Sequence, residues 1–137
     1  MTVERTQYRV DEPIDAVATF AYAGPKAWEE LSGSGSGPIL FGIEQSDGPI
    51  DNGFWQHDDC KRHVLERDGP LVQGFQKGAA FGASDPMADF WRDYVAEPDL
   101  RLPAGHYRLT ALVELIVGRG CDGPPLDLRA SVEVTVR

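Results

Sequence analysis

Hydrophobic and polar residues alternate strictly near the end of the chain. From Leu126 to Arg137 every even-numbered residue is apolar and every odd-numbered residue is polar or charged. From His106 to Val117 the odd-numbered positions are all apolar. A helix would spread these residues around its circumference, so the period of two predicts two strands. The linking segment from Gly118 to Pro125 is rich in Gly and Pro, which favours a long antiparallel hairpin.

Shorter apolar segments, separated by turn signals, occupy the earlier part of the chain. The predicted strands are Thr2–Val10, Ile14–Ala23, Ile39–Ile43, Arg62–Glu66, Leu71–Gln76 and Ala79–Ala83. Together with the hairpin they make seven to eight strands, a number typical of a β-sandwich. We therefore expect a single all-β domain over residues 1–137, built as a two-sheet antiparallel sandwich. The run Gly33–Gly37 is expected to be a mobile loop between strands.

One helix is predicted near residues 86–95. Ser84 offers a cap, and the Pro that follows at position 86 suits a first helical turn. Apolar residues then recur at helical spacing, namely Met87, Phe90, Trp91, Tyr94 and Val95. Such an amphipathic helix is expected to cover one end of the sandwich.

The segment Leu100–Leu109, which reads LRLPAGHYRL, carries a recognisable pattern. It resembles the corner that leads into the penultimate strand of immunoglobulin-like and fibronectin type III-like domains of bacterial surface or secreted proteins. The resemblance implies an immunoglobulin-like sandwich in which the Tyr107 hydroxyl bonds to backbone just upstream. Leu109 stands where antibody-type domains carry a cysteine, so the resemblance does not extend to their inter-sheet disulfide.

The composition argues against nucleic acid and membrane insertion. Acidic residues number 22 against 13 basic ones, a net charge of −9, and phosphate binding requires clustered Lys and Arg. No apolar run approaches the length of about 18 residues needed to span a bilayer. The first residues, Met1 to Arg5, lack the features of a signal peptide. We expect either a cytoplasmic protein or a mature domain with an added Met.

The two cysteines, Cys60 and Cys121, both lie in polar, loop-like surroundings. Buried free cysteines are usually found in apolar surroundings, so a disulfide between the two is predicted. A disulfide places a protein in an oxidising compartment. We therefore expect a secreted or cell-surface protein, with the cytoplasm as the alternative.

Metal ligands are the weaker alternatives, and no cofactor is the main expectation. His57, Cys60 and His63 follow an i, i+3, i+6 spacing that could contribute to a zinc site, although no second close pair of ligands follows. Asp47, Asp51 and Asn52 could bind calcium, but their spacing does not fit an EF-hand, and Asp and Asn beside Gly usually form turns. No catalytic motif is present, so a non-enzymatic protein is expected.

Phe54 and Trp55 follow a tight turn, and one of the two must face outward if the segment is extended. They are the candidate binding residues, because exposed aromatic side chains stack on sugars or anchor protein partners. The predicted function is a non-enzymatic extracellular or surface interaction or accessory module with a protein or glycan partner. The alternatives are a small proteinase inhibitor presenting the loop from Asn52 to Asp58, and a metal-binding domain using His57, Cys60 and His63.

Overall fold

The structure is a computed structural model, and it describes residues 1–54, 56–57 and 59–137. The described chain is all-β apart from one short helix. Its elements in chain order are β1 Thr2–Val3, β2 Gln7–Tyr8, β3 Ala16–Phe20, β4 Trp28–Gly33, β5 Leu40–Gln45, β6 Asp51–Asn52, β7 Lys61–Glu66, β8 Leu71–Gly74, α1 Ala88–Ala96, β9 Gly105–Val117 and β10 Leu126–Val136.

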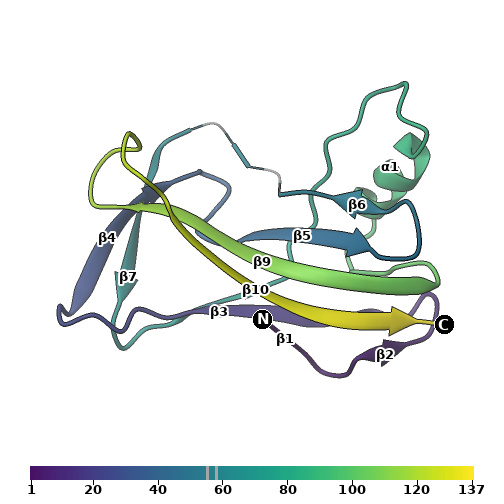
Figure 1. Cartoon of the computed structure of the whole chain (residues 1–137), viewed down its shortest axis with the longest axis horizontal. Helices are drawn as coiled ribbons and strands as arrows, with labels where there is room; N and C mark the ends of the chain where they lie inside the picture. Colours follow the sequence, from purple (N-terminus) through teal and green to yellow (C-terminus); the bar gives the residue numbers. More distant parts are fainter. Residues whose placement is uncertain (55, 58) are drawn as a thin grey trace.

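These strands form two sheets (Figure 1). The small sheet has the order β1-β3-β8. The larger sheet is organised around the predicted hairpin, in which β9 and β10 pair along their whole length. The other edge of β9 is shared by β5 along its first half and by β4 near its end. The strand β7 continues the sheet beyond β4, and β6 pairs with β5.

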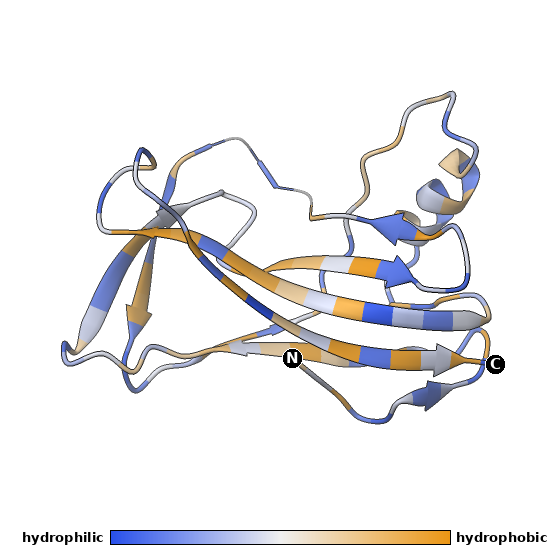
Figure 2. Ribbon diagram, in the orientation of Figure 1, coloured by the Kyte–Doolittle hydropathy of each residue, from blue (hydrophilic) through white to orange (hydrophobic). Residues whose placement is uncertain are grey.

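The hydrophobic core lies between β9 and the small sheet. Leu109 of β9 is completely buried in one cluster with Ala16 of β3 and Val134 of β10. Leu115 and Ala18 belong to a second cluster, which contains no residue of β10. The alternation of apolar and polar residues along both strands of the hairpin is visible in Figure 2. The period-two prediction for the hairpin is therefore confirmed, and the inward face is the apolar one.

The inward face of β10 is covered along only part of its length. Val134 and Val136 are buried, but Leu126 and Leu128 remain 36% and 46% exposed. At this end of the hairpin the core stops at β9. The sequence pattern predicts which way these side chains point, but not that part of the apolar face stays uncovered.

The prediction of a wholly antiparallel sandwich with seven to eight strands is wrong in two respects. The described residues contain ten strands, and β2 runs parallel to β10. The segment Thr2–Val10 is not one strand, because its two ends pair with different sheets as β1 and β2. The segment Ala79–Ala83 forms no strand.

The strand β4 was not predicted, because its sequence Trp-Glu-Glu-Leu-Ser-Gly carries two acidic residues and little apolar alternation. It is a strand because β7 and β9 pair with it from both sides. Its Glu30 is buried yet accepts from Arg62 and Arg119, at 2.9 Å each, and so satisfies the rule that a buried charge needs partners. Gly33 and Ser34 of the expected mobile loop belong to this region, and Ser34 is buried.

The predicted helix is present as α1, but it begins at Ala88 and is not capped by Ser84. The N-cap residue is Met87, and no side chain caps the helix. In the turn before it, the Asp85 carboxylate accepts a hydrogen bond from the Met87 N–H at 2.7 Å. Trp91 and Tyr94 are buried in the core cluster, so the aromatic stripe packs against the end of the sandwich as expected.

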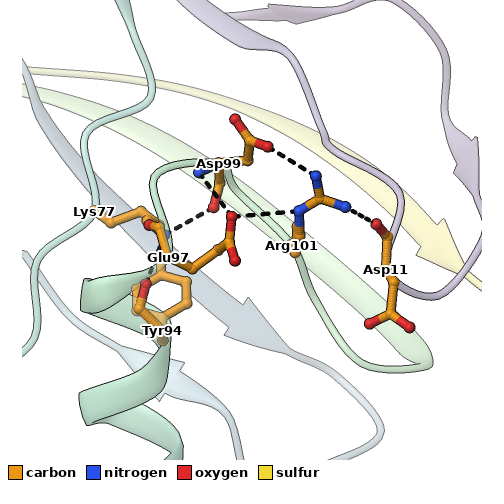
Figure 3. Close-up of polar contacts among 6 residues, drawn as sticks. All are labelled: Asp11, Lys77, Tyr94, Glu97, Asp99 and Arg101. Carbon is orange, nitrogen blue, oxygen red and sulfur yellow. Dashed lines mark hydrogen bonds and ion pairs between the residues drawn. The ribbon is translucent and has the colours of Figure 1, made fainter.

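A lysine from the preceding loop holds the end of α1 (Figure 3). Lys77 Nζ donates to the carbonyl oxygens of Tyr94 at 2.6 Å, of Asp99 at 2.7 Å and of Glu97. The last carbonyls of a helix have no partner within the helix, so a cation at this position satisfies them. Burial lowers the pKa of Lys77. Arg101 fixes the same turn from the other side, through the Asp99 carboxylate at 2.8 Å.

Candidate functional site

The outer face of the large sheet carries a shallow groove across β5, β9 and β10. Its volume is about 280 Å³, and its floor comes from Gly42, Thr110 and Ser131, one residue from each strand. The register places Gly42 opposite Thr110 and Thr110 opposite Ser131. Because small side chains line up across three neighbouring strands, the face is hollowed at this point.

Phe54 forms one wall of this groove. It lies directly over Gly42, where a Cβ atom would come within 3.0 Å of the ring. The ring is half-buried, and the Arg129 guanidinium stands over it at 5.5 Å from the centroid, a distance that allows cation–π attraction. The predicted binding residue Phe54 thus lies at a groove. Trp55 falls outside the described residues.

Hydrogen-bonding groups of both kinds surround the ring. The hydroxyls of Thr110 and Ser131 are 2.8 Å apart on the floor. Arg108 bridges the sheet between Glu44 at 3.2 Å and Glu133 at 3.3 Å. These ion pairs are exposed and are therefore worth little to the fold, so a bound ligand can displace them at low cost.

A second depression of about 160 Å³ continues along the same face and shares Glu44 and Arg108 with the groove. Here His106 is held from two sides. The backbone N–H of His106 donates to Asp47 Oδ1 at 2.9 Å, and the ring Nδ1 lies 3.1 Å from Thr135 Oγ1. The hydrogen bond from the His106 backbone holds the pKa of Asp47 below its ordinary value.

The residues considered for calcium have separate partners. Asp47 bonds His106, as above, whereas the Asn52 side chain donates to the Gly78 carbonyl oxygen. Asp51 pairs with Glu44 across β6 and β5. The Asp47 carboxylate and the Asn52 amide thus hold this segment to its neighbours, whereas Asp51 is placed by the backbone pairing of β6 with β5.

Cys60 and Cys121 form the predicted disulfide, with their Cα atoms 6.0 Å apart. It joins the start of β7 to the loop between β9 and β10. The zinc alternative loses a ligand, because Cys60 has no thiolate while this bond is intact. His63 Nε2 lies 3.0 Å from the Ser34 carbonyl oxygen. Within the described ranges, no three His, Cys, Asp or Glu side chains gather as a metal-binding group.

The loop proposed for proteinase inhibition, Asn52 to Asp58, is attached to the body at several described positions. Besides the contacts of Asn52 and Phe54, the His57 backbone N–H donates to Ser36 Oγ at 2.8 Å, and its carbonyl oxygen accepts from Ser34 Oγ at 2.8 Å. Asp58 lies outside the described residues, so the inhibitor alternative stays a prediction.

Tyr107 makes the hydrogen bond that the family resemblance implies. Its hydroxyl donates to the Pro103 carbonyl oxygen at 2.9 Å, four residues upstream. The side chain is 2% exposed, and burial raises the pKa of Tyr107 to about 12. It is a structural residue that fixes the entry to β9.

Sequence reasoning missed most of the groove. It placed Arg129 and Ser131 on the polar face of the hairpin, but it could not show that Gly42 and Phe54 lie beside them. The signal that was available is the row of polar residues at odd positions of β10, next to the polar positions of β9.

No helix in the described part of the chain has the length and apolar character needed to cross a membrane. Comparison with known protein families, with curated proteins and with solved structures finds no match.

Proposed function

We propose that this chain is a non-enzymatic interaction module of a secreted or surface protein, with an immunoglobulin-like sandwich that binds a neutral glycan in the groove beside Phe54. The observation that carries the proposal is a groove with the Phe54 ring as one wall, the Thr110 and Ser131 hydroxyls on its floor, and Arg and carboxylate side chains in its lining.

The chemistry of a sugar suits this arrangement. A pyranose ring has an apolar C–H face that packs on an aromatic ring, and hydroxyls that both donate and accept hydrogen bonds. Phe54 supplies the ring. Arg108 and Arg129 supply donors, while Glu44 and Asp51 supply acceptors. Charges of both signs alternate along the groove, so it favours an uncharged polar ligand over a polyanion.

Two further features support the proposed location of the module and its fold. The Cys60–Cys121 disulfide is typical of proteins in oxidising compartments. The hydrogen bond from Tyr107 to Pro103 and the two hydrophobic clusters packed between the sheets support the immunoglobulin-like assignment. Fold alone says little of a ligand, so the glycan proposal depends on the groove.

The test is an array of neutral oligosaccharides, followed by calorimetric titration of those that bind. Phe54→Ala should weaken binding at least about five-fold, since an aromatic anchor in a binding site is typically worth more than about 1 kcal/mol. Thr110→Val should also weaken binding, because it keeps the shape of the floor and removes one hydroxyl.

Val72→Ala is the matched control. Val72 is 62% exposed and lies on β8 in the small sheet, so this truncation should leave the affinity unchanged. The proposal fails if no neutral glycan binds, or if Phe54→Ala and Val72→Ala bind the same glycan equally well. Binding to a protein with no glycan would favour the protein-partner alternative.

A further inference from the structure

The outer edge of β10 is a free strand edge. The pairing of β10 with β2 is confined to Thr135 and Val136. Among the described residues, no strand pairs with this edge between Leu126 and Val134. Every residue from Leu126 to Ser131 is exposed. Natural proteins usually protect such an edge, because its unpaired backbone groups can add another strand.

The direction of the free backbone groups follows from the contacts at the end of the strand. The N–H of Thr135 donates to the Thr6 carbonyl oxygen, and the N–H of Arg137 donates to that of Tyr8, at 2.8 and 3.0 Å. Odd-numbered residues of β10 therefore direct their N–H and C=O groups to the outer edge. By the alternation of a strand, Arg129, Ser131 and Glu133 do the same.

We propose that this edge pairs with the same edge of a second copy, antiparallel and centred on Ser131. In this register Ser131 lies opposite Ser131 of the second copy, and Arg129 lies opposite Glu133. All three are residues whose backbone groups face outward, so each pair can exchange two hydrogen bonds.

The side chains make this register self-complementary. Two Arg–Glu pairs of opposite charge form on the polar face, one on each side of the two-fold axis. They replace the exposed ion pairs of Arg129 with Asp127 and of Glu133 with Arg108, which contribute little to the fold. On the apolar face, Ala130 meets Val132 and Leu128 meets Val134 of the second copy. The pairing would cover part of the Leu128 side chain that the core leaves exposed.

Neighbouring registers fit less well. Centring on Ala130 places Asp127 opposite Glu133, and centring on Arg129 places two arginines opposite each other. Centring on Leu128 pairs Asp127 with Arg129 but aligns fewer outward-facing residues. Registers centred closer to the end of β10 are excluded, because β2 already pairs with the edge at Thr135 and Val136.

Such a dimer would form one continuous sheet across the two-fold axis. Because that axis is perpendicular to the sheet, both outer faces lie on the same side, and the two grooves beside Phe54 would face the same surface. The dimer itself does not depend on the ligand of the groove, and its test uses no glycan.

The experiment measures molar mass by light scattering and by sedimentation equilibrium over a wide range of protein concentration. The wild-type chain should approach twice its 15.0 kDa. Ser131→Pro should remain monomeric, because proline removes an N–H that faces the free edge and not the one that pairs with β9. Circular dichroism and thermal unfolding would establish that this variant is folded.

Charge exchange keeps the test valid even if proline disturbs the strand. Arg129→Glu and Glu133→Arg should each weaken the dimer, because like charges then lie opposite each other. The double variant should restore the dimer by exchanging the two partners. A register centred on Leu128 would not be restored, since Asp127 would then face Glu at position 129.

The inference is overturned if the wild-type chain stays monomeric at every concentration, or if folded Ser131→Pro dimerises as well as the wild type. If the double variant does not regain the molar mass of the dimer, the register centred on Ser131 is overturned.

Discussion

Removing the disulfide between Cys60 and Cys121 should destabilise the protein more than any surface substitution. The two residues are 61 positions apart in sequence, and their bond closes nearly half of the chain into a loop. The perturbation is the double variant Cys60→Ser, Cys121→Ser, compared with the oxidised wild type.

The size of the effect follows from the length of this loop. In the chain-entropy account, closing a loop of about 60 residues lowers the entropy of the unfolded state enough to stabilise the fold by about 4 kcal/mol at 25 °C. For a chain of 137 residues, an unfolding entropy of about 2 cal/mol/K per residue converts this to a fall in Tm of roughly 15 °C.

The assay is urea unfolding followed by circular dichroism, together with calorimetry for Tm. The same measurement on the wild type with reductant should agree with the double variant. Reductant should leave the double variant itself unchanged. A loss below about 1 kcal/mol would refute the reasoning, because the loop would then contribute little entropy to the unfolded chain.

Three further predictions concern single residues. Tyr107→Phe should lower the free energy of unfolding by about 1 kcal/mol in urea titration, because it removes the hydrogen bond to Pro103; an unchanged stability would show that the corner does not depend on it. Lys77→Met should cost about 2 kcal/mol in the same assay, since three carbonyl oxygens lose a charged donor; Lys77→Arg should cost less, and equal losses would contradict this. Asp47 has a folded pKa below its ordinary value of 3.8, so it stabilises the fold above that pH and the contribution is lost as pH falls through the folded pKa. Asp47→Asn should therefore flatten the acid limb of the stability profile, and a profile parallel to the wild type would count against the His106 contact.

The sequence was most informative where one physical rule acted along many residues. The hairpin of β9 and β10 was predicted nearly to the residue, because alternation over more than ten positions leaves no helical solution. The disulfide was predicted because both cysteines lay in polar segments. The helix was predicted in place, but the predicted cap Ser84 was wrong, because the helix starts later, with Met87 as its N-cap residue.

What the sequence could not show was which strands become neighbours. The strand β4 depends on pairing with β7 and β9, and its buried Glu30 is neutralised by Arg62 and Arg119 from distant segments. Such tertiary contacts override a weak local pattern. For the same reason the groove was invisible, since Phe54 and Arg129 meet only when β5 and β10 flank β9.

The most direct test of the account is a map of amide chemical shifts on isotope-labelled protein, titrated with a neutral oligosaccharide that binds on the array. The account predicts that perturbations concentrate at Gly42, Phe54, Thr110 and Ser131, on the outer face of the large sheet. Perturbations confined to α1 or to the β1-β3-β8 sheet would contradict it.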